Sequence, residues 1–246
     1  MVLRFGVITL IPEIMESLRY GVTGRALERE LASLDCWNPR DWAELPYRQV
    51  DDKPYGGGPG MLMMYEPLHA SIAYAKGCLP NCKTVYLSPQ GKTQDQAALN
   101  SLVKTAQPLL FVAGRYEGID ERVITQDIDE EWSLGDFVLS GGELAAMVYI
   151  DAMIRLLPGS LGHNCSAAQD SHMQGVLDCP HYTRPALVDG LEVPAVLLGG
   201  HHKEIEQWRR KQALGNTWKK RPDLLAKLVL SESDQSMLDE FIREQG

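Results

Sequence analysis

A short apolar run enclosed by glycines, WSLGDFVLSGGE at residues 132–143, lies directly before an unbroken helical pattern. Gly135 precedes the run Phe137, Val138 and Leu139, and two more glycines follow it. Glycine is favoured where backbone turns tightly or approaches a ligand with no side chain between. The pattern predicts a buried strand inside 134–140 that leads into a glycine-lined ligand loop. A tight strand-to-helix turn without any ligand is the alternative.

Two other segments repeat this design, TVYLSPQGK at 84–92 and LLFVAGRYEGID at 109–120. In each, an apolar run rich in β-branched or aromatic residues is closed by turn residues, as is typical of a buried strand. Ligand pockets in α/β folds form at such strand ends. Three strand ends of one kind therefore predict that the loops converge on a single ligand.

Strand and helix patterns alternate through the first two thirds of the chain, which predicts an α/β domain with a mostly parallel sheet. Strands are expected at 2–11, 84–88 and 109–113, with a polar loop at 47–60. Residues 159–180 are polar and weakly periodic. We expect an α/β domain at 1–160, a flexible linker at 161–179 and a small helical domain at 180–246. Helices are expected at 12–34, 61–76, 93–106, 143–157, 202–215, 222–229 and 234–244.

Several protein classes are excluded by composition. No apolar run approaches the ~20 residues of a membrane span, and the N-terminus, MVLRFGVITLIPE, does not resemble a signal peptide. The five cysteines are scattered, as is typical of free thiols in a reducing cytoplasm. Cys78 and Cys82 have no matching Cys or His pair, so a structural zinc site is not expected.

The net charge of −9 conceals a basic segment. Residues 201–221 contain seven lysines and arginines against Glu204 and Glu206, a net charge of +5. Such a patch attracts phosphates within a Debye length of about 8–10 Å. Trp208 and Trp218 lie within it and are suited either to base stacking or to a core. A solvated basic helix is the alternative interpretation.

Common catalytic motifs are absent from the sequence. Neither GxGxxG after the first strand nor GxxxxGK[ST] occurs. The glycines at 56–60 are followed by Met61 where a phosphate loop needs lysine, which makes a phosphate-loop hydrolase a poor candidate. No Ser-His-Asp or nucleophilic cysteine arrangement is evident.

Long motifs along nearly the whole chain resemble those of the bacterial tRNA (guanine-N1-)-methyltransferases, which belong to the knotted SPOUT methyltransferases. The resemblance implies an α/β domain whose C-terminal part forms a trefoil knot, although general folding rules disfavour knots. The motifs are YGGGPGM at 55–61, YLSPQG at 86–91, GRYEGIDERV at 114–123, EEWSLGDFVLSGGE at 130–143, LDCPHYTRP at 177–185 and RPDLL at 221–225.

The resemblance also implies an activity and its partners. The enzyme would transfer a methyl group from S-adenosylmethionine to N1 of guanine 37 of tRNA, as a homodimer with shared active sites. Mg²⁺ would engage either Glu117 and Asp170 or atoms of the substrate. Residues expected to contact tRNA are Arg155 and Asp170, by motif match, and Arg209, Arg210, Lys219 and Arg221 of the basic segment 201–221. Residues matched to the cofactor pocket are Tyr86, Leu87, Ser88, Pro89, Gly114, Tyr116, Glu117, Gly118, Leu134, Gly135, Asp136, Phe137, Val138, Leu139, Gly141 and Gly142.

The chemistry requires help at the acceptor, because guanine N1 carries a proton. By motif match, Asp170 would remove this proton and Arg155 would bind the guanine. A carboxylate with its usual pKa of about 3.9 is a weak base, so a raised pKa or a cation at O6 is needed. Arginine can provide that cation by forking toward O6 and N7. Without the resemblance, Asp170 would be interpreted as a solvated loop residue and Arg155 as a surface residue.

His172, Met173 and Gln174 depart from the family pattern, in which an aromatic residue often follows the Asp-Ser pair. We predict no catalytic role for His172. Two other functions remain open. One is a catalytically inactive RNA-binding protein that uses the basic segment 201–221. The other is a related knotted methyltransferase that modifies a different RNA base.

Overall fold

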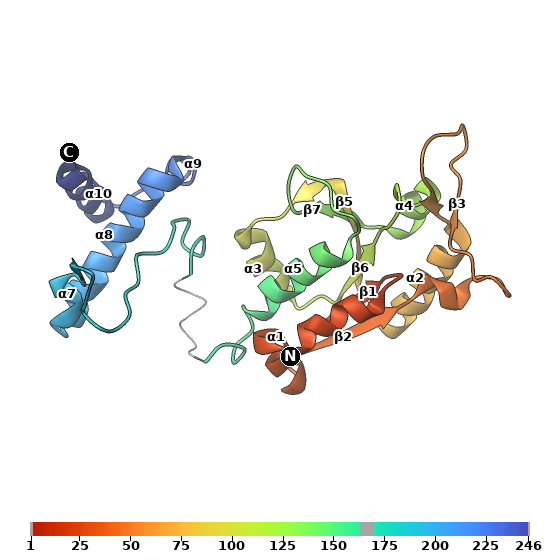
Figure 1. The fold of residues 1–246 in the computed structure, drawn as a ribbon, viewed down its shortest axis with the longest axis horizontal. Coiled ribbons are helices and arrows are strands. Elements are labelled where there is room, and N and C mark those ends of the chain that lie inside the picture. Colours follow the sequence, from red (N-terminus) through yellow and green to blue (C-terminus); the bar gives the residue numbers. More distant parts are fainter. Residues whose placement is uncertain (1, 163–169, 246) are drawn as a thin grey trace. The chain divides into compact units, whose positions relative to one another are not determined.

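The computed structural model describes residues 2–162 and 170–245. The chain divides into two compact units, Met1–Asn164 and Cys165–Gly246 (Figure 1). Cys165 and the middle of the expected linker at 161–179 lie outside the described residues. The expected domain boundaries and the flexibility of the linker stay predictions.

A five-stranded sheet forms the centre of the first unit (Figure 1). Its strand order is β2-β1-β6-β5-β7, and every neighbouring pair is parallel. The mostly parallel α/β domain expected from the sequence is thereby confirmed. The strands are β1 (Leu3–Ile8), β2 (Ala32–Trp37), β5 (Lys83–Thr93), β6 (Leu109–Ala113) and β7 (Glu130–Ser133).

Alternate residues of the central strands enter two separate hydrophobic cores, as the side-chain period of two requires. On β6, Leu109, Phe111 and Ala113 face one core, whereas Leu110 and Val112 face the other. All five are at most 1% exposed, so helices cover both faces, as is usual for parallel sheets. The first core contains residues of η1 (Pro12–Arg19), α1 (Gly21–Glu28), α3 (Gln96–Thr105) and α5 (Glu143–Ile154); the second contains residues of α2 (Tyr65–Cys78) and α4 (Glu121–Asp127).

The strand predicted inside 134–140 is wrong. The last strand of the sheet, β7, ends at Ser133, and the apolar run that follows is an exposed loop. Phe137 is 55% and Val138 82% exposed, and the Phe137 amide donates to the Gly135 carbonyl at 2.9 Å in a tight turn. A run of apolar residues indicates that their side chains prefer to leave water. It does not indicate whether the run forms a strand of the sheet or a loop that lines a cavity.

The helical pattern expected over 12–34 contains η1, α1 and the start of β2. The edge strand β2 was missed because its sequence, ASLDCW, lacks a continuous apolar run. Edge strands keep one side open to water and tolerate polar residues such as Asp35. Short elements complete the first unit: η2 (Pro39–Trp42) and the antiparallel pair β3 (Asp51–Asp52) and β4 (Leu62–Met63).

The second unit is helical, which confirms the expected helical C-terminal region. Its small core joins α8 to α10 through Ala213, Leu214 and Leu238, and Val176 and Cys179 pack on it. No helix among the described residues is long and apolar enough to cross a membrane. The elements are β8 (Leu187–Val188), β9 (Leu191–Glu192), α7 (Ala195–Leu198), α8 (His202–Lys220), α9 (Pro222–Leu225) and α10 (Glu232–Gln245).

Candidate functional site

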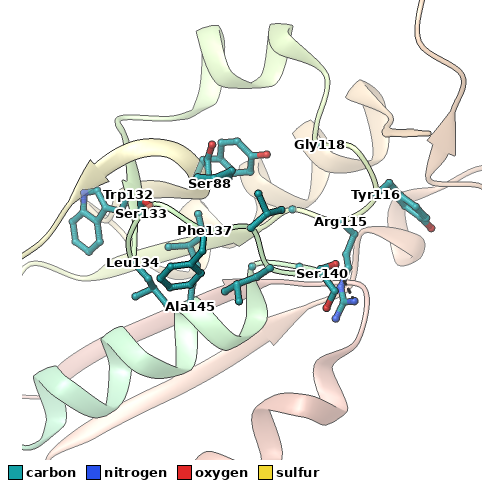
Figure 2. A pocket seen from close by; sticks show the side chains of 18 of the residues that line it. Ser88, Arg115, Tyr116, Gly118, Trp132, Ser133, Leu134, Phe137, Ser140 and Ala145 are labelled. Atoms are coloured by element: carbon teal, nitrogen blue, oxygen red, sulfur yellow. Dashed lines mark hydrogen bonds between the residues drawn. The ribbon is translucent and has the colours of Figure 1, made fainter. Parts of the chain in front are cut away.

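Three loops at the carboxyl edge of the sheet surround one cavity in the first unit (Figure 2). They are residues 86–89 inside β5, where the pairing with β7 is interrupted between Leu87 and Lys92, and the loops at 114–118 after β6 and 134–142 after β7. The cavity has a volume of about 170 Å³, whereas one water needs about 10–15 Å³ measured in this way. It therefore has the size for an organic ligand rather than a single ion.

The structure places most of the sequence-predicted cofactor residues on this cavity. The exceptions are Gly135 and Asp136, which belong to the same loop but do not line it. Whether the lining residues bind a cofactor stays a prediction. Those that line the cavity are Tyr86, Leu87, Ser88, Pro89, Gly114, Tyr116, Glu117, Gly118, Leu134, Phe137, Val138, Leu139, Gly141 and Gly142.

Sequence reasoning missed five lining residues, namely Arg115, Trp132, Ser133, Ser140 and Ala145. All five lie inside or next to the glycine-rich motifs, but a pattern of glycines and apolar residues does not indicate which polar neighbour points inward. Figure 2 shows the apolar Leu134, Phe137 and Ala145 at one end of the cavity and Arg115 and Ser140 at the other. The cavity therefore has an apolar end and a polar end.

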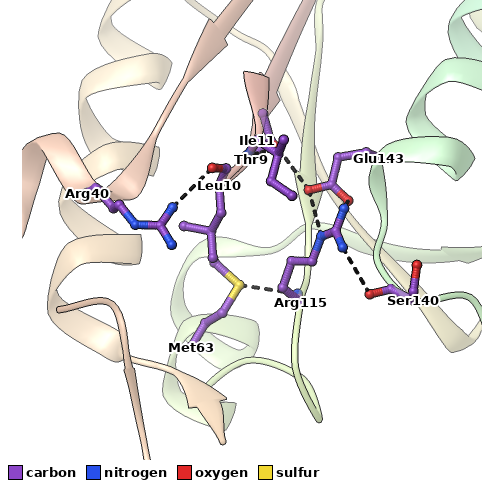
Figure 3. Close-up of polar contacts among 8 residues, drawn as sticks. All are labelled: Thr9, Leu10, Ile11, Arg40, Met63, Arg115, Ser140 and Glu143. Carbon is purple, nitrogen blue, oxygen red and sulfur yellow. Dashed lines mark hydrogen bonds and ion pairs between the residues drawn. The ribbon is translucent and has the colours of Figure 1, made fainter. Parts of the chain in front are cut away.

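A hydrogen-bonded network centred on Glu143 forms the polar end (Figure 3). Arg115 Nε donates to Glu143 Oε1 at 3.1 Å, and the Thr9 hydroxyl donates to the same oxygen at 2.8 Å. Arg115 also donates to the Ser140 carbonyl at 3.4 Å. Glu143 begins α5, Thr9 follows β1 and Arg115 follows β6. The network thus ties four segments together beside the cavity.

Two of the glycines lie where a side chain would have no room, Gly141 against the side chains of Arg115 and Glu143 and Gly142 against the backbone of β6. A Cβ at Gly141 would lie 2.4 Å from Arg115 Nε, and one at Gly142 would lie 2.7 Å from the Cα of Ala113. The Gly142 amide donates to the Gly114 carbonyl at 3.0 Å. The loop after β7 can rest on the loop after β6 only because these side chains are absent.

Two buried tyrosines hold the other side of the site. The Tyr149 hydroxyl of α5 donates to the Ser133 carbonyl at the end of β7 at 2.6 Å. Burial raises the pKa of Tyr149 to about 12, and burial with nearby Glu131 and Glu121 raises the pKa of Tyr86 to about 12. Both phenols therefore stay protonated near neutral pH, and the Tyr149 phenol acts as a hydrogen-bond donor.

Neither of the two predicted catalytic residues lines this cavity. Arg155 lies at the far end of α5 from Gly142, roughly 20 Å along the helix at 1.5 Å per residue. Asp170 belongs to the second unit, where it lines another cavity with Asp178, His181 and Arg209. Their roles therefore stay predictions.

The basic segment 201–221 contains the whole of α8, but part of its charge is neutralised by acids outside it. Arg210 forms a bidentate pair with Asp234 at 2.8 and 2.9 Å, and Arg221 a bidentate pair with Asp223 at 2.7 and 2.8 Å. Lys211 contacts both Glu240 and Glu244. Lys219 donates to Gln245. The net positive potential is smaller than the residue count of the segment indicates.

One group of side chains in the described part of the chain could hold a metal ion. The ligand atoms of Asp178, Cys179 and His181 lie within 4.8 Å of one another. A hydrogen bond between Asp178 and His181 at 2.9 Å already accounts for this grouping. The four cysteines that the structure describes, Cys36, Cys78, Cys82 and Cys179, are free thiols.

Comparison with known proteins shows to which of them the chain is similar. Residues 3–227 match the family model described as tRNA (guanine-1)-methyltransferase TrmD. The chain is 68% identical over 247 residues to a tRNA (guanine-N(1)-)-methyltransferase of Legionella pneumophila strain Philadelphia 1, covering 100% of this chain and 99% of the relative. A protein of the same name from Coxiella burnetii strain RSA 493 is 56% identical, with 100% of both chains covered. Another from Enterobacter sp. strain 638 is 55% identical, covering 98% of this chain and 95% of the relative.

Proposed function

The chain belongs to the tRNA (guanine-1)-methyltransferase TrmD family, and from this premise we propose that it methylates N1 of guanine 37 of tRNA with S-adenosylmethionine as donor. The family and the enzyme class expected from the sequence motifs are thereby confirmed. The observation that carries the finer proposal is the single cavity on which the three motif loops converge. The cytoplasm, where the free thiols stay reduced, is the proposed location.

The cavity suits this methyl donor. Phe137 and Leu134 offer apolar surface to an aromatic base. Glu117 also lines the cavity and brings a negative charge to it, which favours a cation. S-adenosylmethionine supplies a methyl group on a positively charged sulfur. The protein's task on this side is to bind and orient, because displacement at a sulfonium carbon needs no proton transfer at the donor.

We propose that the three loops form the trefoil knot of the SPOUT fold. Close packing of the loops supports this proposal. A Cβ at Gly91 would lie 2.5 Å from the backbone of Glu131 and Trp132, and one at Gly142 would lie 2.7 Å from Ala113. Such contacts between glycines and bare backbone are what a chain needs when it passes tightly around itself.

A homodimer with shared active sites is also proposed. Arg155 lies ten residues beyond Ala145, the last α5 residue that lines the cavity, which is roughly 15 Å along the helix, so within one chain it is poorly placed to act there. On α5, Leu144 is 52% and Val148 is 51% exposed. In the cavity loop, Phe137 is 55% and Val138 is 82% exposed. Leu144 and Val148 are one turn apart on α5, and an exposed apolar helix face of this kind is typical of a protein interface. The partner's Arg155 would then complete the site.

In the proposed mechanism, Asp170 accepts the proton of guanine N1 while Arg155 stabilises the negative charge that spreads toward O6. Asp170 requires a cation near O6, because an ordinary carboxylate is a weak base toward guanine. The arginine fork provides both this charge and the orientation of the base. The protonated Tyr86 phenol, whose pKa is about 12, takes no part as a base.

Mg²⁺ is implied by the family resemblance, with Glu117 and Asp170 as its expected partners. Mg²⁺ prefers oxygen ligands in octahedral geometry. Glu117 lines the cavity of the first unit, whereas Asp170 lies in the second, and the three-residue group in the described part contains Cys179 and His181. No step of the mechanism is therefore assigned to the ion.

For tRNA binding we propose α8 and its flanks, with Arg209, Arg210, Lys219 and Arg221 near the phosphates. Arg209 lines the cavity that also contains Asp170, which supports a role close to the reacting base. Arg210 and Arg221 are paired with Asp234 and Asp223. They would have to exchange these partners for phosphate, so Arg209 is expected to contribute more.

Incubation with tRNA and labelled methyl donor, followed by nucleoside analysis, tests the reaction and its position. We expect 1-methylguanosine at position 37. A methyl group on another base would support a different knotted methyltransferase, and tRNA binding without product would support an inactive RNA-binding protein. Asp170→Ala should lose turnover but keep cofactor binding. Near-normal turnover would remove Asp170 from its proposed role.

Mixed dimers test whether active sites are shared. One subunit carries Arg155→Ala, and the other carries Gly114→Leu, whose side chain would meet Tyr86 inside the cavity. Shared sites leave one complete site in each mixed dimer, so activity should return on mixing two inactive variants. Continued inactivity, together with an active wild-type mixture treated identically, would contradict sharing.

A further inference from the structure

We propose that Glu143 makes the cavity selective for a positively charged ligand by neutralising Arg115 at its polar end. The inference rests on the proposed function, because it concerns how the same cavity distinguishes the sulfonium donor from its uncharged thioether product. Glu143 itself does not line the cavity, so it acts through Arg115 as a positioning and charge-balancing residue.

The charges around the cavity define the problem. Among the described lining residues, Arg115 and Glu117 are the charged ones. If Arg115 carried an uncompensated charge, it would cancel Glu117 and repel a cation. A third charge, on Glu143, pairs with Arg115 and leaves Glu117 as the uncompensated charge at the cavity. The site is then negative overall and attracts a cationic ligand.

The pairing is close and buried. Arg115 Nη2 lies 3.0 Å from Glu143 Oε2, and Nε donates to Oε1 at 3.1 Å. The Glu143 side chain is 1% exposed and that of Arg115 is 21% exposed. In such surroundings the attraction between charges is much stronger than in water. A buried ion pair often adds little to the free energy of folding, because removing both charges from water is costly. A role at the adjacent cavity explains its presence better than a role in stability.

Thr9 fixes the carboxylate in this orientation. Its hydroxyl donates to Glu143 Oε1 at 2.8 Å and accepts from the Ile11 amide at 3.0 Å (Figure 3). Oε2 has no hydrogen-bond partner among the described residues, although Arg115 Nη2 lies 3.0 Å away. Contact at Oε2 is therefore an ion pair with bent geometry, and it supplies charge rather than a second well-aligned hydrogen bond.

The donor and the product differ by one charge, which makes the test specific. S-adenosylmethionine carries a sulfonium, and S-adenosylhomocysteine carries a neutral thioether with otherwise similar groups. Glu143→Gln keeps the size of the side chain but exposes the charge of Arg115 to the ligand. The ratio of the donor's Kd to the product's Kd should rise on the order of fivefold, the effect of a unit charge about 10 Å away at an effective dielectric constant of about 35.

Calorimetric titration of both ligands into wild type and variants gives this ratio directly. Adding Arg115→Gln to Glu143→Gln removes the exposed charge and should return the ratio to the wild-type value. Asp127→Asn is the matched control, since Asp127 is 8% exposed and pairs with His69 at 2.8 Å away from the cavity. It should leave the ratio unchanged.

A Glu143→Gln variant that weakens both ligands equally would overturn the proposal, because a purely structural role predicts that result. If Glu143→Gln fails to fold, Arg115→Gln replaces it and should lower the ratio; an unchanged ratio would again overturn the proposal. Wild-type protein that binds neither ligand would instead overturn the proposed function. The two failures are thus distinguishable.

Discussion

Replacing Gly142 with alanine tests the close packing of the cavity loops. The new Cβ would lie 2.7 Å from the Cα of Ala113 and 3.1 Å from the Gly114 amide nitrogen. Both are backbone atoms at the end of the buried strand β6, so neither can move aside as the tip of a flexible side chain would. The φ of Gly142 is −77°, which alanine adopts without strain. Any loss of stability therefore reports contact rather than backbone conformation.

Inserting atoms into well-packed protein typically costs about 1–3 kcal/mol. For a domain of this size, 1 kcal/mol lowers the melting temperature by about 2–4 °C. Gly142→Ala should therefore lower the Tm of the first unit by about 2–12 °C. Gly142 also lines the cavity, so cofactor affinity should fall in the same variant.

Thermal unfolding followed by circular dichroism measures the change, with two matched variants. Gly77→Ala lies inside α2 with nothing within 4 Å of the new Cβ, and it should gain about 0.5–1 kcal/mol of stability. Gly142→Ser introduces the same Cβ, but serine is a favoured residue before a helix. A Gly142→Ser protein as stable as wild type would show that poor capping, not contact with Ala113, explains any loss in Gly142→Ala.

Three further outcomes are expected. The hydrogen bonds from Arg210 lower the pKa of Asp234. The pair therefore stabilises the second unit fully above the ordinary carboxyl pKa of about 3.9, and this stabilisation is lost as the pH falls through the lowered pKa. In urea unfolding, Asp234→Asn should lower the free energy of unfolding by about 1–2 kcal/mol at pH 7 but by little at pH 2. His172→Ala should keep methyl transfer in the labelled-donor assay, and loss of transfer with intact tRNA binding would contradict this. The affinity for tRNA should fall steeply with salt if α8 contacts phosphates, and a flat response in filter binding would count against that surface.

Local sequence predicted the strands β1, β5 and β6 and the position of the site along the chain. The apolar run at 109–113 coincides with β6 and the run at 84–88 with the buried first half of β5, because residues buried on both faces of a parallel sheet leave a continuous apolar signal. Turn residues after these runs predicted the loops that line the cavity. The long motifs identified the family, which no periodicity could have done.

The same local signals failed where burial and strand pairing separate. Phe137, Val138 and Leu139 have the composition of a strand, yet they form an exposed loop beside the cavity. The edge strand β2 has the mixed composition of a helix surface or a loop. In both cases the deciding factor is which neighbouring segment is available for hydrogen bonding, and this depends on the order of strands in the sheet.

Only the tertiary structure decided the charges at the site. Thr9 and Glu143 are 134 residues apart in the chain, and Arg115 and Glu143 are 28 apart, yet they share one buried carboxylate. Likewise, Asp234 neutralises Arg210 from another helix, which the charge count of residues 201–221 does not reveal. A residue's type and its neighbours in the chain determine whether it prefers water or the interior. Its partner there depends on how segments distant in sequence are brought together, because electrostatic interactions act through space.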